Sequence, residues 1–169
     1  MPFPAETKKL DYEVEMAMVI GKRAYRIARE DALDHVFGFT IYNDLSARDM
    51  GEQKWGVPLL AKNLPGFAPM GPYLVTRDEI DDLHSIGLRS RVNGELRQSS
   101  TIAHMRFKIA DQIAFWSQIG LEPGDVITTG TPGGVAAGRG PEDTPWWLQP
   151  GDLVECEVDG LGTLRTRIG

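Results

Sequence analysis

The chain has 169 residues, of which 41% are hydrophobic and 25% charged, and its formal net charge at pH 7 is −6. This composition is typical of a folded soluble protein rather than a disordered tail, and the length suits one domain with one core. No run of basic residues offsets the negative charge, so nucleic acid and anionic membrane surfaces are disfavoured as partners. We therefore expect a single domain over residues 1–169, with residues 1–10 as a lead-in.

The N-terminal segment MPFPAETKKL does not have the pattern of a signal peptide. No apolar run approaches the roughly 18 residues that span a bilayer. These two observations predict a cytoplasmic protein. The single cysteine, Cys156, stands between two acids in an alternating segment, which indicates a small buried hydrophobe rather than a reactive thiol.

The first predicted element is a strand over Leu10–Gly21, LDYEVEMAMVIG. Side chains alternate between the faces of a strand, so Glu13 and Glu15 point one way and the apolar side chains point the other. Like charges at this spacing repel each other unless water or a cation lies between them. The pair indicates either a solvated strand face or a metal site, and this segment alone leaves both open.

The next segments predict a short helix, a strand and a long loop. REDALDHVFG has acids at its start and Gly38 at its end, as a helix would. FTIYNDLS reads as a strand that carries Asn43 and Asp44 near its end. The segment 47–70 has no regular pattern, and a loop of this length is usually functional or mobile. GPYLVT resumes extended structure, and LRSRVNGELRQ predicts a hairpin.

The segment MRFKIADQIAFWSQIG, residues 105–120, predicts the one long helix, because its apolar residues recur at helical spacing. A turn, a strand and the glycine-rich loop GTPGGV follow, and PGDLVECEVDGLGTLRTRI predicts a second hairpin. The loop lacks the GxxxxGK[ST] pattern, which disfavours nucleotide binding. Several strands with two helices, and no alternating βαβ units, predict a β-rich α+β fold.

Six segments, taken together and in this order, resemble the fumarylacetoacetate hydrolase family. They are the EVE strand, NDLSARD, AK before FAPMGP, VNGELRQ, LEPGDVITTGTPGGV and PGDLVECEVDGLGTL, and the resemblance runs from about Asp11 to Ile168. It implies a β-sandwich roll of mixed sheets with two short-to-medium helices. It also implies one divalent metal ion, Mg²⁺ or Mn²⁺ with Ca²⁺ as a further option, and a homodimer.

The resemblance assigns metal ligands. In the family the two acids of the ExE strand and the aspartate of the ND motif bind the metal, and these match Glu13, Glu15 and Asp44. Three oxygen ligands suit a hard cation that keeps its other positions for water and substrate.

Three further residues are expected to carry the catalytic chemistry. Lys62 matches the pocket lysine of the family and would add positive charge near the substrate oxygens. Arg48 would hold either a substrate carboxylate or a ligand carboxylate. Thr131 would offer a hydroxyl or a backbone amide to the substrate carboxylate. Asp49 is expected to be structural, and His104 to have a helix-start or packing role.

The implied function is that of an enzyme of aromatic-compound or 2-oxo acid metabolism, acting on a small 2-oxo acid or 1,3-dicarbonyl acid through a metal-bound enolate. C–C bond hydrolysis and isomerisation, tautomerisation or decarboxylation all stay open. Hydrolytic members carry a preceding lid segment with a His and Glu pair, which we expect this chain to lack. A glutamine that some members have after SARD falls on Gly51, with Gln53 nearby, so the substrate stays open.

Two rival hypotheses remain. The first is a non-catalytic or partner-dependent metal-binding module whose lid and base come from another chain. The second is a β domain that binds a sugar or an organic acid without an ion.

Overall fold

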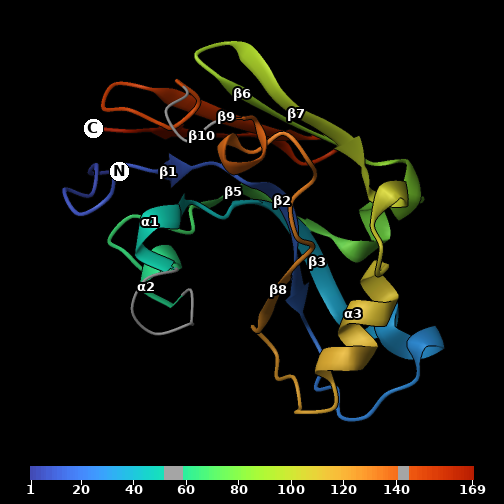
Figure 1. Cartoon of the computed structure of the whole chain (residues 1–169). Coiled ribbons are helices and arrows are strands. Elements are labelled where there is room, and N and C mark those ends of the chain that lie inside the picture. The colour runs from blue at the N-terminus through green and yellow to red at the C-terminus, as the bar shows by residue number, and fades with distance from the viewer. Residues whose placement is uncertain (52–58, 141–144) are drawn as a thin grey trace.

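The computed structural model describes residues 1–51, 59–140 and 145–169. Its strands form two four-stranded sheets and one two-stranded sheet (Figure 1). The first four-stranded sheet has the order β5 (Met70–Thr76), β3 (Val36–Asn43), β2 (Val14–Ile20), β8 (Val126–Thr128). The second has the order β10 (Gly162–Arg167), β9 (Leu153–Val158), β6 (Gly87–Val92), β7 (Glu95–Thr101). β1 (Leu10–Asp11) pairs with β4 (Ser46–Ala47).

The helices are short. The α-helices of the described residues are α1 (Arg48–Gly51), α2 (Leu59–Lys62) and α3 (Ile109–Trp116). The 3₁₀ helices are η1 (Arg29–His35), η2 (Arg77–Glu79), η3 (Leu83–Ser85), η4 (Ile102–His104) and η5 (Ala136–Gly138). The β-rich α+β class is confirmed. The paired strands run antiparallel, whereas the family resemblance implied mixed sheets.

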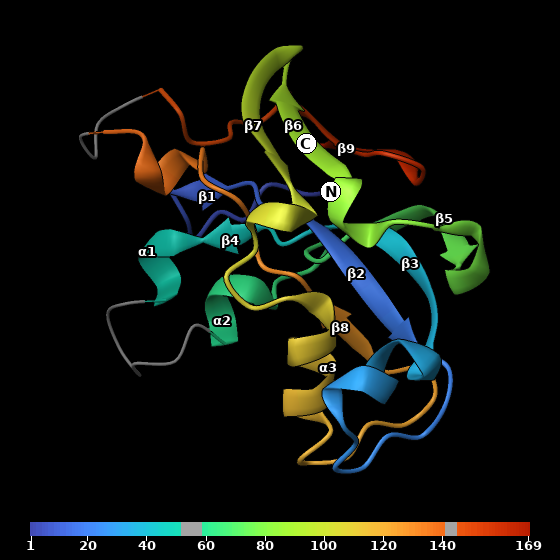
Figure 2. The same cartoon turned by 90° about the vertical axis from the view of Figure 1, so that its right-hand side faces the viewer.

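The two larger sheets pack face to face and enclose the core. β2 and β3 contact β9 across this interface, and α3 packs against η1 beside β8 (Figure 2). The alternating sequence of β9 explains this packing. Its apolar residues Val154, Cys156 and Val158 face the core and are buried, whereas the intervening acids Glu155 and Glu157 are only partly buried. Cys156 belongs to this buried side and is fully buried, as its position in the sequence predicted.

The single strand predicted over Leu10–Gly21 is two strands in the structure, β1 and β2, which are separated by Tyr12 and Glu13. The backbone N–H of Tyr12 donates to the Asp11 carboxylate and that of Glu13 donates to the Asn43 side chain, so neither group is available to a strand partner. The predicted loop 47–70 begins at the last residue of β4 and contains the two helices α1 and α2. Each of these helices is too short for its periodicity to be visible in the sequence.

The predicted long helix is shorter than expected. The Asp111 carboxylate accepts a hydrogen bond of 3.0 Å from the backbone N–H of Lys108, so the helix begins only after Lys108. It ends at Trp116, and Gly120 adopts a positive φ of 89° in the turn that follows. The segment REDALDH forms the 3₁₀ helix η1 rather than an α-helix. Within the described ranges, no helix has the length and apolar character needed to cross a membrane.

We predict that Gly38→Ala destabilises the protein. A Cβ atom at Gly38 would lie 2.3 Å from the carbonyl oxygen of Val75 in the neighbouring strand, so β3 and β5 would have to separate. We expect the free energy of unfolding to fall by about 2 kcal/mol, measured by urea denaturation. Gly138→Ala is the matched control, since its Cβ would meet only Val135 at an ordinary 3.8 Å. Equal stability of the two variants would contradict the prediction.

Candidate functional site

Three predicted ligands gather at one end of the central strand pair. Glu15 lies in β2, Glu13 directly precedes that strand, and Asp44 directly follows β3. The backbone N–H of Asp44 donates to the carbonyl of Glu13 at 2.9 Å, which fixes the two segments side by side. One carboxylate oxygen from each residue lies within 4.8 Å of the other two. Glu13 and Glu15 are 6% and 2% exposed, so the alternative of a solvated strand face is wrong.

Two cationic side chains, Lys62 and Arg48, form ion pairs with these acids. Lys62, at the end of α2, donates from Nζ to Oε2 of Glu13 at 2.9 Å and also to the Asp44 carboxylate. Arg48, in α1, donates from Nη2 to Oε1 of Glu13 and from Nε to Oδ2 of Asp11 at 3.0 Å. Of the two roles expected for Arg48, this geometry is that of a group holding a predicted ligand carboxylate.

Asp11 is a fourth buried acid, and the sequence reasoning missed it. Its side chain is fully buried and accepts from the backbone N–H groups of Ala136 at 2.7 Å and Ala137 at 3.1 Å, in addition to Arg48. Asp11 therefore ties β1 to both α1 and η5. Its two-residue spacing from Glu13 continues the spacing of Glu13 and Glu15, and this signal could have revealed it.

Gln98, in β7, is a second missed residue and is 1% exposed. Its Oε1 accepts from the backbone N–H of Val14 at 3.1 Å, and its Nε2 donates to Oγ1 of Thr131 at 2.8 Å and to the carbonyl of Pro132 at 2.9 Å. This single amide thus links β2 to the glycine-rich loop. Its place at the end of the VNGELRQ motif was the available signal, but nothing in the sequence pointed to these partners.

Thr131 uses its hydroxyl within the protein. Oγ1 donates to the carbonyl of Val14 at 3.0 Å and accepts from Gln98. Among the hydrogen bonds of the described residues, the backbone N–H of Thr131 has no acceptor. Of the two groups that the sequence suggested for a substrate carboxylate, the N–H is therefore the one available.

Burial and neighbouring charges shift the pKa values of Glu15, Asp44 and Lys62. Burial raises the pKa of Glu15 to about 7, with a further contribution from the charges of Asp44 and Glu13. Burial also raises the pKa of Asp44, although Lys62 acts against this shift. Partial burial lowers the pKa of Lys62, but its hydrogen bonds to Asp44 and Glu13 outweigh that effect and the net pKa is raised.

The charges at the site suit a divalent cation. Within residues 1–51, 59–140 and 145–169, the four carboxylates of Asp11, Glu13, Glu15 and Asp44 face two cationic side chains, which leaves two negative charges unbalanced when all four acids are ionised. An unbalanced charge away from water is unfavourable, and a divalent cation would remove the imbalance. Carboxylate oxygens are the donors that Mg²⁺, Mn²⁺ and Ca²⁺ prefer. The residues present therefore fit such an ion.

The acids open into a cavity of about 800 Å³. Glu13, Glu15, Asp44 and Lys62 form one side of it, and Thr131 contributes from the glycine-rich loop. The opposite wall comes from α3 and the turn before it and is largely aromatic, with Phe107, Phe115 and Trp116. The cavity is large enough for a small organic acid.

The remaining residues singled out in the sequence lie elsewhere. Asp49 accepts from the hydroxyl of Thr7 and from the backbone N–H of Lys8 at 2.8 Å, a structural role. His104 lines a second, smaller cavity. Gly51 ends α1, and Gln53 lies outside the described residues.

Comparisons with known proteins identify the family of the chain. The chain matches the family described as "Fumarylacetoacetate (FAA) hydrolase C-terminal" over residues 1–169, which confirms the resemblance. It is 48% identical over 167 residues to "Oxaloacetate tautomerase fahd2, mitochondrial" from Xenopus laevis, covering 98% of this chain and 51% of that protein. The chain thus spans about half the length of the curated relatives it matches.

Solved structures show the same fold. A fumarylacetoacetate hydrolase from Exiguobacterium antarcticum superposes with a TM-score of 0.91 at 40% identity, covering 96% of this chain and 57% of that one. A fumarylpyruvate hydrolase from Pseudomonas aeruginosa, in complex with Mn²⁺ and pyruvate, superposes with a TM-score of 0.87 at 30% identity, covering 99% and 69%.

We predict that Asp11→Asn lowers stability. The amide would turn an N–H group toward backbone N–H donors and would remove the charge that Arg48 faces. Breaking a buried ion pair in this way should reduce the free energy of unfolding by about 3 kcal/mol, measured by urea denaturation. Asp82→Asn is the control, because Asp82 is exposed and, among the described residues, its carboxylate accepts only from the local backbone N–H of His84. A loss as small as that of the control would contradict the assigned role of Asp11.

We predict that Mn²⁺ binding weakens as the pH falls. With a pKa of about 7, Glu15 is largely protonated at pH 6, and the cation must displace that proton. At pH 8 the carboxylate is already ionised. For one displaced proton, the association constant should drop about tenfold between pH 8 and pH 6, measured by titration calorimetry. An association constant that does not change over this range would be inconsistent with a buried, proton-binding Glu15 at the site.

Proposed function

The chain belongs to the fumarylacetoacetate hydrolase family, and we propose that it catalyses the divalent-metal-dependent enol–keto tautomerisation of a small 2-oxo acid. One observation carries the proposal: the carboxylates of Glu13, Glu15 and Asp44 converge with the Lys62 ammonium at the wall of a cavity of about 800 Å³. The relative from Xenopus laevis, named as an oxaloacetate tautomerase, supports the reaction type.

Glu13, Glu15 and Asp44 would hold the cation, with Mg²⁺ or Mn²⁺ as the proposed ion. When bound, it would supply positive charge beside the carbonyl oxygen on which negative charge develops as a neighbouring C–H bond breaks. The Pseudomonas aeruginosa structure, which contains Mn²⁺ and pyruvate, supports both the ion and the class of acid.

Lys62 contributes a second positive charge. Its raised pKa keeps the side chain as an ammonium at neutral pH, so it does not act as a base there. From its position between Glu13 and Asp44 it would stabilise negative charge on a substrate oxygen at the same end of the cavity. Arg48 acts differently, because it holds Glu13 and Asp11 and so positions a ligand rather than the substrate.

The substrate carboxylate would bind at the glycine-rich loop. The backbone N–H of Thr131 is without an acceptor in the described part of the chain, and the hydroxyl of the same residue is fixed by Gln98 and the Val14 carbonyl. A rigidly held donor loses little freedom when it binds an anion. The aromatic wall of Phe107, Phe115 and Trp116 would face the carbon skeleton.

Tautomerisation suits this site better than C–C hydrolysis. Hydrolysis needs a group that activates an attacking water, and histidine is the commonest such group. Among the described residues that line this cavity there is no histidine, and its fourth acid, Asp111, is paired with Arg29. Enol–keto exchange breaks the enol O–H bond and forms a C–H bond at the neighbouring carbon, with the proton exchanged through solvent, and it needs no activated nucleophile. A metal-binding module without activity remains the rival.

The test is an assay of oxaloacetate enol-to-keto conversion, followed by the ultraviolet absorbance of the enol, beside an assay of acylpyruvate cleavage. We expect conversion that depends on added Mg²⁺ or Mn²⁺ and is abolished by a chelator. Cleavage would favour the hydrolase reading instead, and inactivity in both assays would favour the module.

We predict that Glu13→Gln and Asp44→Asn lose cation binding and at least about a hundredfold in rate together, since each removes a ligand charge. Lys62→Met should lower the rate at least about tenfold but keep cation binding, because it removes a competing positive charge. Calorimetry with Mn²⁺ and the enol assay measure the two effects.

The matched control is Glu122→Gln, an exposed acid paired with Arg23, which should change neither quantity. A Glu13 variant that stays active with unchanged metal dependence would refute the assignment of the site.

A further inference from the structure

The side-chain amide of Gln98 makes four hydrogen bonds, although only 1% of this residue is exposed. Its Oε1 accepts from the backbone N–H of Val14 at 3.1 Å and from the hydroxyl of Ser90 at 2.8 Å. Its Nε2 donates to Oγ1 of Thr131 at 2.8 Å and to the carbonyl of Pro132 at 2.9 Å. A primary amide has two donor and two acceptor positions, so groups from three other segments satisfy Gln98 completely.

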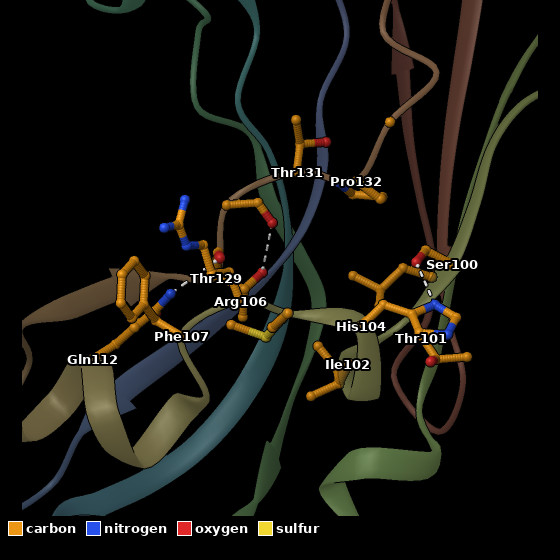
Figure 3. Close-up of a pocket in the computed structure, with 14 residues that line it drawn as sticks. Ser100, Thr101, Ile102, His104, Arg106, Phe107, Gln112, Thr129, Thr131 and Pro132 are labelled. Atoms are coloured by element: carbon orange, nitrogen blue, oxygen red, sulfur yellow. Dashed lines mark hydrogen bonds between the residues drawn. The ribbon is translucent and has the colours of Figure 1, made fainter.

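The two hydrogen bonds that Gln98 donates fix one part of the glycine-rich loop. Thr131 and Pro132 follow one another in this loop and line the smaller cavity (Figure 3). Oγ1 of Thr131 accepts from Gln98 and donates to the carbonyl of Val14 at 3.0 Å, so this hydroxyl is held from two sides. Val14 is the residue between the two acids of the central strand. These bonds therefore set the spacing between the backbone N–H of Thr131 and the predicted metal ligands.

The carboxylates of the predicted metal ligands are held by other groups. Two cationic side chains pair with the Glu13 carboxylate, and one of them also pairs with Asp44. The Glu15 carboxylate accepts from the backbone N–H of Gly130 at 2.9 Å. Among the hydrogen bonds of the described residues, none joins the Gln98 amide to any of these three carboxylates. Removing the amide would therefore release the loop and leave the three carboxylates with their partners.

We propose that Gln98 is a positioning residue that sets the affinity for the substrate carboxylate but not the affinity for the cation. It acts through Thr131, whose backbone N–H meets the carboxylate while the oxo group of the same molecule meets the cation. A 2-oxo acid makes both contacts at once only when the loop and the metal ligands keep a fixed spacing. The placement of the carboxylate at Thr131 rests on the proposed function.

The experiment measures the two affinities separately by titration calorimetry. Mn²⁺ is titrated into the protein alone, and pyruvate is titrated into the protein saturated with Mn²⁺, so the readout is binding and needs no turnover. Gln98→Met removes the donors and the acceptor of the amide together. We expect this variant to bind pyruvate at least about tenfold more weakly. Its affinity for Mn²⁺ should change by less than about threefold, because the ligand carboxylates keep their own partners.

A second variant, Gln98→Glu, has the shape of the native side chain and tests the inference if the methionine variant does not fold. Its carboxylate keeps an acceptor for the Val14 N–H and the Ser90 hydroxyl, but it has no N–H group for Thr131 and Pro132. We expect pyruvate binding to weaken at least about tenfold here as well. Mn²⁺ binding should not weaken, because the added charge is negative.

Ser90→Ala is the matched control. Ser90 is fully buried, and its hydroxyl donates to the same Oε1 of Gln98. In the described part of the chain this hydroxyl makes no hydrogen bond to the loop or to a predicted metal ligand. The variant should lower the midpoint of urea denaturation, because it removes a buried hydrogen bond, and it should leave both affinities unchanged.

Three results would overturn the inference: a pyruvate affinity that neither Gln98 variant lowers, a Mn²⁺ affinity that falls by the same factor as the pyruvate affinity, or an equal loss of pyruvate affinity in Ser90→Ala. Absence of pyruvate binding to the unmodified Mn²⁺-loaded protein would overturn it too. Failure of the proposed reaction is distinguishable. Pyruvate binding that depends on Gln98, without oxaloacetate conversion, upholds the positioning role and rejects only the reaction.

Discussion

The structure depends on keeping several carboxylates close together out of water. Asp11, Glu13 and Glu15 are almost fully buried, and Asp44 lies beside them. Among the described residues, only Arg48 and Lys62 form ion pairs with these acids. Buried acids that exceed their counterions must either bind protons or bind a cation. The raised pKa of Glu15, about 7, is the first response. A divalent ion would be the second, and both arise from the same unbalanced charge.

The acids stay in place because side chains, rather than strand partners, satisfy the backbone around them. The central strand would otherwise leave polar groups unpaired where it breaks between β1 and β2. The acceptors come from four different parts of the chain: Asp11 for Tyr12, Asn43 for Glu13, Gln98 for Val14 and Thr129 for Met16. The site is therefore built where both larger sheets and the glycine-rich loop meet.

The two neighbouring cavities differ in the charge of the residues that line them. The carboxylates of Glu13, Glu15 and Asp44 line the larger cavity, whereas the described residues that line the smaller one include Arg106 and His104 but no aspartate or glutamate. Gly130 stands between them, with its N–H bonded to Glu15 at 2.9 Å. A single short loop thus binds a predicted metal ligand and lines both cavities.

By itself the sequence determined the β-rich class, the two hairpins and the spacing of Glu13, Glu15 and Asp44, because strand alternation and turn residues are local properties. It did not reveal Asp11 and Gln98 as parts of the site, the break in the opening strand, or the short helices α1 and α2. Those features depend on partners that are distant in the chain: Ala136 is 125 residues from Asp11, and Val14 is 84 residues from Gln98. Only the tertiary structure brings such groups together, and burial then decides whether an acid is a solvated surface residue or a charge that needs a counterion.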